Sequence, residues 1–206
     1  MTGDTMHTHD ELFASYQPVP DLYDEMSIGA GSLRPHWNKF VQMAAKLGKA
    51  EFASRSEVAR HNLKDNGVTY NVYGDPQGMD RPWEFDLLPL LISASEWKRI
   101  EEGLIQRATL LNKILVDLHG PRTLLREAGL PPSLLFGNPG FLRPCAGFEV
   151  PNNTYLHLLA VDLARAADGK WWVLADRTQS PSGSGYALEN RIIASRALPT
   201  EFRDCQ

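Results

Sequence analysis

The sequence predicts an α/β fold with a helical section towards its N-terminal end. Three observations predict it: helical apolar spacing in the first half, two β-rich runs around an Asp-Gly turn in the second half, and another helical pattern after them. Of the 206 residues, 43% are hydrophobic and 22% are charged, which leaves enough apolar material for a buried core.

Composition narrows the classes of function. The net charge of -4 provides no broad basic surface, so we expect no nucleic-acid partner, whereas ATP needs only a local positive pocket. No run approaches the ~20 apolar residues of a membrane helix, and the first residues do not resemble a signal peptide. Cys145 and Cys205 show no zinc-ligand spacing. We therefore expect a cytoplasmic protein with two reduced cysteines and no membrane partner.

The N-terminal elements follow from simple patterns. Residues 1–22 are polar and without a period, which predicts a flexible leader. Apolar spacing predicts a helix from Pro35 to a stop at Gly48, and then a second helix that ends at Gly67. The alternating, β-rich residues 68–73 predict a strand.

A capping-box sequence from Ser93 to Glu96 opens the longest predicted helix, and Gly120 ends it. The helix has an apolar stripe, which we interpret as core-facing. The stripe consists of Trp97, Ile100, Leu104, Ala108, Leu111, Leu115 and Leu118. A short helix near 122–127 and an irregular segment over 131–151 are expected next.

The β-rich runs 155–164 and 170–176 flank Asp168-Gly169, which predicts a hairpin. A two-residue turn would place Asp162 and Asp176 on opposite faces of the sheet, so a shared metal requires an odd loop or a bulge. We predict a three-residue loop over 168–170, which places Asp162 directly opposite Asp176.

The segment after the second run combines an arginine, hydroxyl groups and glycines, and a helix is expected from about Ala187. Mg²⁺ usually takes one or two carboxylates together with phosphate oxygens, so Asp162 and Asp176 are candidate ligands. A glycine-rich bend and a helix N-terminus suit phosphates, and Arg177 can clamp an anion in a bidentate manner. The alternative is an ordinary hairpin with a surface Asp162 and a flexible Ser/Gly loop.

Several long strings also resemble a known family. They are WWVLADRTQSPSGSGYALENR (171–191), NGVTYNVYGD (66–75), RPW (81–83), GLIQR (103–107) and GFLRPC (140–145), with YDEM (23–26) and RPHW (34–37) extending the match. They resemble the circularly permuted ATP-grasp (type 2) family, which is related to glutathionylspermidine synthases. The resemblance covers nearly all of residues 23–204.

The resemblance implies a fold that holds ATP between two lobes. It also implies a reaction in which a carboxylate is activated as an acyl phosphate and then attacked by an amine. The superfamily holds Mg²⁺ with an Asp on one strand and a Glu-x-Asn pair on the next, followed by a Pro-Gly loop. Asp162 matches the first ligand, Asp176-x-Thr178 replaces the pair, and Pro181-Ser-Gly183 replaces the loop. Asp for Glu shortens the reach, and Thr for Asn keeps one neutral oxygen.

The resemblance thus implies ATP and Mg²⁺ as cofactors, and small-molecule or peptide carboxylate and amine substrates. It assigns metal binding to Asp162, Asp176 and Thr178, phosphate binding to Ser180, Ser182, Gly183, Ser184 and Gly185, and catalytic contacts to Arg177 and Arg191. The superfamily grips ATP with lysines on a β-rich lobe, expected downstream in the permuted order. We therefore expect residues 23–206 to be the N-terminal part of such a domain, truncated at the C-terminus and inactive alone. The alternative is a non-catalytic module of the same fold that binds a peptide or a partner chain.

Overall fold

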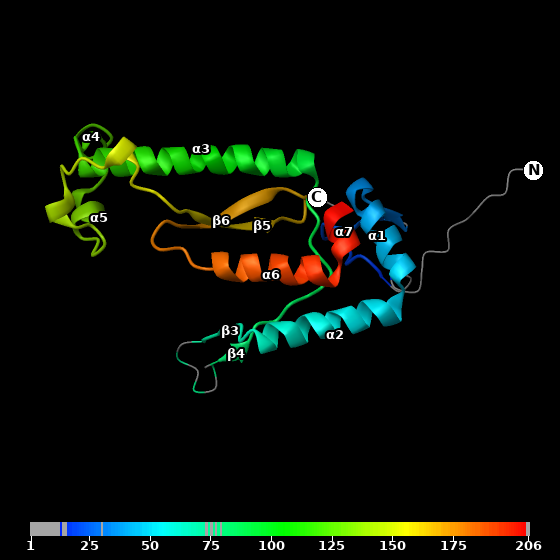
Figure 1. Ribbon diagram of the computed structural model, residues 1–206. Coiled ribbons are helices and arrows are strands. Elements are labelled where there is room, and N and C mark those ends of the chain that lie inside the picture. Colours follow the sequence, from blue (N-terminus) through cyan, green and yellow to red (C-terminus); the bar gives the residue numbers. More distant parts are fainter. Residues whose placement is uncertain are drawn as a thin grey trace, which may run out of the picture. The chain divides into compact units, whose positions relative to one another are not determined.

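The computed structural model describes residues 13, 16–29, 31–72, 74, 76, 78 and 80–204. Within them the chain forms two compact units (Figure 1). The first unit draws on Met1–Ser93, Ala166–Gly169 and Ser182–Gln206, and the second consists of Ala94–Arg165 and Lys170–Pro181. Both units combine helices with small antiparallel sheets, in agreement with the predicted α/β class. Most of the leader predicted over residues 1–22 lies outside the described residues, and it stays a prediction.

The first unit contains the two predicted N-terminal helices. Its elements are β1 (Ser27–Gly29), β2 (Ser32–Leu33), α1 (Pro35–Leu47), α2 (Lys49–Asp65), β3 (Thr69–Tyr70), β4 (Arg81–Pro82), α6 (Ser184–Ala197) and α7 (Pro199–Asp204). Proline suits the first position of α1, and Gly48 ends this helix with a φ of 78°. The strand predicted over 68–73 is present at β3, while Tyr73 lies outside the described residues.

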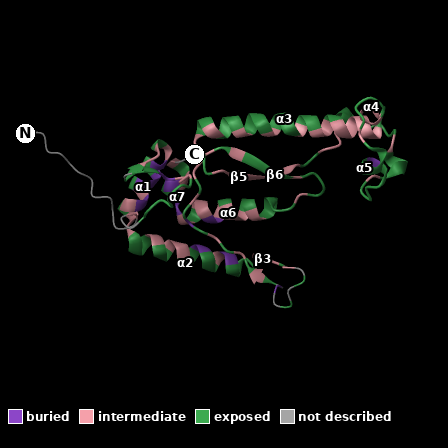
Figure 2. Ribbon diagram, turned by 180° about the vertical axis from the view of Figure 1, so that it is seen from behind, coloured by how far each residue is buried: buried purple, intermediate pink, exposed green. Residues whose placement is uncertain are grey.

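Two hydrophobic clusters form the core of the first unit (Figure 2). The larger cluster contains Met26, Trp37, Phe40, Val41, Ala44, Leu87 and Leu198. The smaller one joins Ala59 and Leu63 of α2 to Ile193 of α6. Burying each large apolar side chain contributes about 1.5–3 kcal/mol. Ile193 therefore fixes α6 against α2, and with it the segment from which α6 begins.

The second unit is built on one long helix and a hairpin. Its elements are α3 (Ala94–His119), α4 (Thr123–Arg126), α5 (Pro132–Phe136), two short 3₁₀ turns (Arg143–Cys145 and Pro151–Asn153), β5 (Ala160–Arg165) and β6 (Trp171–Arg177). The predicted long helix, the short helix after it and the hairpin are confirmed. The segment expected to be irregular over 131–151 also contains α5. Cys145 is a free, exposed thiol, whereas Cys205 lies outside the described residues.

The apolar stripe of α3 is not the core surface that its spacing predicted. None of the described residues of this helix is fully buried, and Trp97 of the stripe is exposed. The other stripe residues are only partly covered. The physical reason is size, since a two-stranded hairpin offers too little surface to bury one face of a 26-residue helix.

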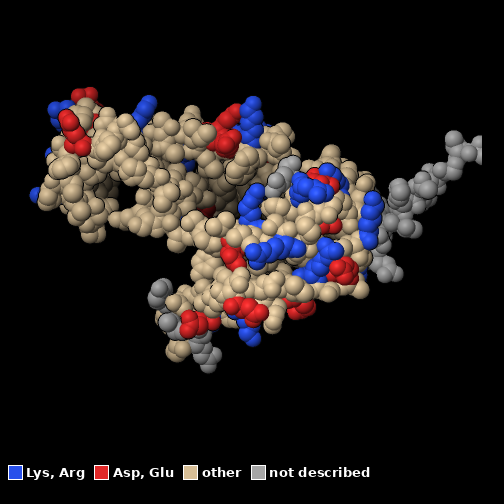
Figure 3. All heavy atoms as spheres, viewed as in Figure 1, with Lys and Arg blue, Asp and Glu red and all other residues tan. Residues whose placement is uncertain are grey.

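On the face seen in Figure 3, acidic and basic side chains lie close together around α1 and α7. None of the helices in the described part of the chain combines the length and the apolar composition that a membrane crossing demands.

Candidate functional site

The register of the β5–β6 hairpin differs from the predicted one. Asp162 lies opposite Ala175, and Asp176 lies opposite Val161. Two features cause the difference: the connection runs over residues 166–170, because Arg165 already pairs with Trp171, and the register shifts at a bulge between Asp162 and Leu163. The bulge inserts one unpaired residue into β6 and thereby reverses which face each following side chain occupies. The prediction that Asp162 lies opposite Asp176 is therefore wrong.

The two carboxylates consequently point to opposite faces of the hairpin. Asp176 forms an ion pair with Arg107 of α3, so its face is the one that packs against α3. Asp162 forms an ion pair with Arg177, on the other face. This conformation does not allow both carboxylates to bind one ion directly. Within the described residues, no group of three or more His, Cys, Asp or Glu side chains is arranged to hold a metal.

Arg107 and Asp176 form a bidentate ion pair. Nε of Arg107 donates to Oδ1 of Asp176, and Nη2 donates to Oδ2, each at 2.6 Å. The Asp176 side chain is only 19% exposed, whereas the guanidinium is more open. Hydrogen bonds from Arg107 hold the pKa of Asp176 below its ordinary value, and the same bonds raise the pKa of Arg107. The two hydrogen bonds chiefly fix the orientation of the carboxylate, since an aspartate is ionised at neutral pH in any case.

Arg107 was not among the residues assigned a role from sequence. It lies within the GLIQR string that supports the family resemblance, which was the one available signal. The string says nothing of the partner, because Arg107 and Asp176 are 69 residues apart in the chain.

Arg177, the predicted anion clamp, is bound to Asp162. Its Nε and Nη2 donate to Oδ2 of Asp162 at 3.0 Å and 2.8 Å. Both side chains are well exposed, and such surface pairs contribute only about 0.2–1 kcal/mol. A phosphate or carboxylate ligand can therefore replace Asp162 at little cost.

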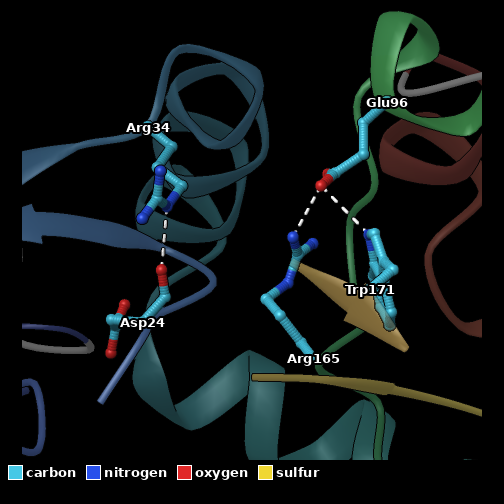
Figure 4. A network of polar contacts seen from close by, with 5 residues as sticks. All are labelled: Asp24, Arg34, Glu96, Arg165 and Trp171. Atoms are coloured by element: carbon cyan, nitrogen blue, oxygen red, sulfur yellow. Dashed lines mark hydrogen bonds and ion pairs between the residues drawn. The ribbon is translucent and has the colours of Figure 1, made fainter. Parts of the chain in front are cut away.

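The hairpin is anchored to α3 at its other end by Glu96 (Figure 4). Oε1 of Glu96 accepts hydrogen bonds from Nη1 of Arg165 at 2.6 Å and from Nε1 of Trp171 at 3.1 Å. The guanidinium of Arg165 lies 4.1 Å from the centre of the Trp171 ring, and its side chain is only 6% exposed. These contacts hold the last residue of β5 and the first of β6 on the helix, and so orient the strands that position Asp162 and Asp176.

The rest of the second unit's candidates follow β6. Thr178 is exposed, two residues beyond Asp176, and contributes to a cavity wall. Ser180 has a φ of 46°, which is uncommon for a residue with a side chain.

The predicted phosphate-binding residues Ser182, Gly183, Ser184 and Gly185 form the exposed start of α6, in the first unit. Gly183 precedes the helix with a φ of 108°, and no side chain caps the first N–H groups there. Uncapped N–H groups at a helix N-terminus favour an anion. The bend is open rather than packed against the core, as phosphate binding requires.

An aromatic stack supports this bend from behind. Tyr186 stacks on Trp83 with ring centres 4.4 Å apart, and its hydroxyl donates to the carbonyl of Thr69 at 2.6 Å. Nε1 of Trp83 donates to Oδ1 of Asn190, one turn further along α6. The helix start is therefore held in place while its N–H groups stay accessible.

Arg191 lies exposed on α6, with its guanidinium 5.0 Å from the centre of the Phe202 ring. A second arginine of the first unit, Arg34, donates from Nε to the carbonyl of Asp24 at 2.8 Å and so stabilises the local fold (Figure 4).

The candidate residues divide into two groups. Asp162, Asp176, Arg177, Thr178 and Ser180 belong to the second unit, and Ser182, Gly183, Ser184, Gly185 and Arg191 to the first.

A comparison with known protein families assigns this chain to one of them. Residues 89–206, more than half of the chain, match the sequence profile of the circularly permuted ATP-grasp type 2 family. The chain is a member of that family, as the sequence strings predicted.

Relatives of this chain occur in several bacteria. The chain is 40% identical over 190 residues to an uncharacterized protein of Mycobacterium tuberculosis, 35% over 189 residues to one of Synechocystis, and 33% over 197 residues to one of Mycobacterium leprae. The alignments cover 88%, 92% and 94% of this chain, but only 22%, 39% and 34% of these relatives. The chain therefore spans well under half the length of the relatives it matches.

Proposed function

We propose that this chain contributes the metal- and phosphate-binding part of an ATP- and Mg²⁺-dependent carboxylate–amine ligase. Family membership supports the proposal, because ATP-grasp proteins generally use these two cofactors. The observation that carries it is the Asp176 carboxylate, which Arg107 holds in a fixed orientation near the end of β6, four residues before the first serine of the serine–glycine segment.

The donor chemistry fits Mg²⁺. Asp176 and Thr178 offer hard oxygen atoms two residues apart, and Mg²⁺ needs only one or two protein ligands beside phosphate oxygens. Asp162 points to the other face and is paired with Arg177, so it does not complete this metal site in the present conformation. The open N-terminus of α6 fits a phosphate group.

When bound, Mg·ATP would supply the phosphoryl group that turns a carboxylate into an acyl phosphate, the intermediate that an amine then attacks. The protein's own contribution is to position groups and neutralise charge. Arg107 holds the Asp176 carboxylate in a fixed orientation. In the second unit, Arg177 would pair with a phosphate or with the substrate carboxylate, and Ser180 would donate a hydrogen bond to a phosphate oxygen. In the first unit, Arg191, Ser182 and Ser184 offer the same kinds of group.

We further propose that a β-rich, lysine-bearing lobe completes this site, and that the substrates are a small-molecule or peptide carboxylate and an amine. The greater length of the relatives supports this lobe. So does the exposed apolar surface of β6, where Trp172 and Leu174 are 61% and 68% exposed. A cytoplasmic location belongs to the same proposal, because the cytoplasm supplies the ATP.

One observation favours a second function, a non-catalytic binding module. Both candidate carboxylates are paired with arginines, and Asp176 and Thr178 stand where the superfamily has Glu and Asn. Calorimetry with Mg·ATP separates the two functions, using the purified chain and a full-length relative. Micromolar binding that requires Mg²⁺ supports the ligase. Absence of binding by both proteins supports the module and contradicts the ligase.

A further inference from the structure

The second unit contains a cavity of about 360 Å³ between the C-terminal half of α3, helix α5 and the segment after β6. Small-molecule sites in proteins usually measure about 300–1,000 Å³. All the residues that line it belong to the second unit. Of the candidate metal- and phosphate-binding residues described above, Thr178 alone lines this cavity.

The wall of the cavity is mainly apolar. Its apolar lining comes from Leu115 and Leu118 of α3, from Leu134 and Leu135 of α5, and from Leu130 and Phe141. No Asp, Glu, Lys or Arg is among the described residues that line it. A phosphate, carboxylate or ammonium group in contact with this wall gains no ion pair from it, so the wall favours uncharged ligands.

A few polar groups interrupt the apolar wall. Nδ1 of His119 lies 3.0 Å from the carbonyl oxygen of Leu115, and when it donates there, Nε2 is left as an acceptor. The His119 ring also stacks on Tyr155, with ring centres 4.9 Å apart, which holds its orientation. Asn138 and Gln179 add amide groups. Apolar walls with a few fixed polar groups are typical of small-molecule sites.

Gly140 allows two polar side chains of the wall to pack closely against the backbone. A Cβ at this position would lie 3.1 Å from Oδ1 of Asn138 and 3.2 Å from Nε2 of Gln179. The two amide side chains therefore approach the chain here because the residue has no side chain. Asn138 is itself fixed, since its Oδ1 accepts a hydrogen bond from the N–H of Gly140 at 2.8 Å.

We propose that this cavity binds an uncharged apolar or aromatic side chain of the ligase's carboxylate or amine substrate. The inference rests on the proposed function, which supplies the substrate. Thr178 and Gln179 lie two and three residues after Asp176 in the chain and line the cavity, so a substrate side chain held here is connected to the metal-binding segment through these two residues. The lining selects an apolar group such as that of leucine or phenylalanine, and rejects lysine and glutamate.

Methyl NMR of the leucine-labelled chain tests this selectivity directly. The probes are N-acetyl-leucinamide, N-acetyl-phenylalaninamide and N-acetyl-lysinamide, without ATP or Mg²⁺. The first two are expected to cause saturable shifts of the Leu115, Leu118 and Leu135 methyl groups, and the lysine probe to bind at least about tenfold more weakly. Equal binding of all three probes, or no shifts at millimolar concentration, overturns the proposal.

Two substitutions that fill the cavity locate the site. Leu115→Trp, and Leu134→Trp on the exposed rim, are each expected to weaken binding of the phenylalanine probe by about tenfold. Leu110→Trp is the matched control, because Leu110 is exposed on the same helix and does not line the cavity. The rim variant keeps the test valid if Leu115→Trp does not fold. Unchanged affinity in the folded variants contradicts the proposal.

This test is independent of ATP. If Mg·ATP fails to bind while the apolar probes bind as expected, the ligase proposal falls and the cavity remains a ligand site of another kind. If Mg·ATP binds and the probes do not, only the cavity assignment is lost.

Discussion

Arg107 on α3 and Asp176 on β6 are joined by two parallel hydrogen bonds, Nε to Oδ1 and Nη2 to Oδ2, each of 2.6 Å. The pair ties the long helix to the one candidate carboxylate that lies on the covered face of the hairpin. Because Asp176 is the proposed metal ligand, its protonation state connects the stability of the second unit with its ability to bind a cation.

The first prediction concerns pH. The pKa of Asp176 is lowered in the folded state, chiefly by the hydrogen bonds from Arg107. The stability that this pair contributes is therefore complete above the ordinary aspartate pKa of 3.8 and is lost as the pH falls through the lowered value. Arg107→Gln should raise the pKa of Asp176 towards 3.8. The free energy of unfolding should then depend less on pH in the acidic range. Carboxyl-carbon NMR titration of both proteins measures the shift, and an unchanged pKa would show that Arg107 is not its cause.

The second prediction concerns the cation. Asp176→Asn keeps the shape of the side chain but removes its charge, so the Mg²⁺-dependent part of ATP binding should weaken by at least about tenfold. Asp65→Asn is the control, since Asp65 is exposed at the end of α2 in the first unit. Calorimetry with and without Mg²⁺ measures the difference, and equal affinities for Asp176→Asn and the control would remove Asp176 from the site.

The helices that pack the first unit could be predicted from sequence, and the reason is local. Trp37, Phe40, Val41 and Ala44 are the buried residues of α1, and their spacing alone identifies the buried face. The same method failed on α3, because spacing shows which face is apolar and not how much surface covers it.

The candidate site could be predicted only in part. The Asp-Gly turn located the hairpin, yet the faces of Asp162 and Asp176 depend on a bulge beside Leu163 that has no compositional mark. The partner of Asp176 depends on packing between distant segments, so no local pattern could have indicated that Arg107 pairs with it.

The third prediction concerns the anchor of the hairpin. Glu96→Gln removes the charge that faces the buried Arg165 guanidinium, and removing one partner of a buried ion pair costs about 3 kcal/mol. Glu101→Gln, on an exposed position of the same helix, should change the free energy of unfolding by less than about 0.5 kcal/mol. Chemical denaturation followed by tryptophan fluorescence compares them. Similar losses in both variants would show that the Glu96 network does not hold the strands.

The fourth prediction concerns the exposed apolar residues of β6. Trp172→Ser and Leu174→Ser remove side chains that are 61% and 68% exposed, so each should change the stability of the chain by less than about 0.5 kcal/mol. The same changes should reduce self-association, because they shrink an exposed apolar surface beside a strand. Sedimentation velocity over a range of concentrations measures association. A large loss of stability would mean that these two side chains are buried in solution, and would contradict the exposed position that the structure gives them.

The last prediction separates two glycines at the start of α6. Gly183 has a φ of 108°, so a Cβ strains the backbone although no atom lies within 4 Å of it. Gly183→Ala should therefore destabilise the first unit by about 1–2 kcal/mol. Gly185 lies inside the helix, also with open space around the added Cβ, and Gly185→Ala should instead stabilise it by about 0.5–1 kcal/mol. Thermal unfolding of the two variants measures these opposite signs.

Because the bend before α6 is the proposed phosphate cradle, Gly183→Ala should also weaken Mg·ATP binding more than Gly185→Ala does. Equal effects of the two changes on stability and on binding would show that the left-handed turn at Gly183 does not shape the cradle.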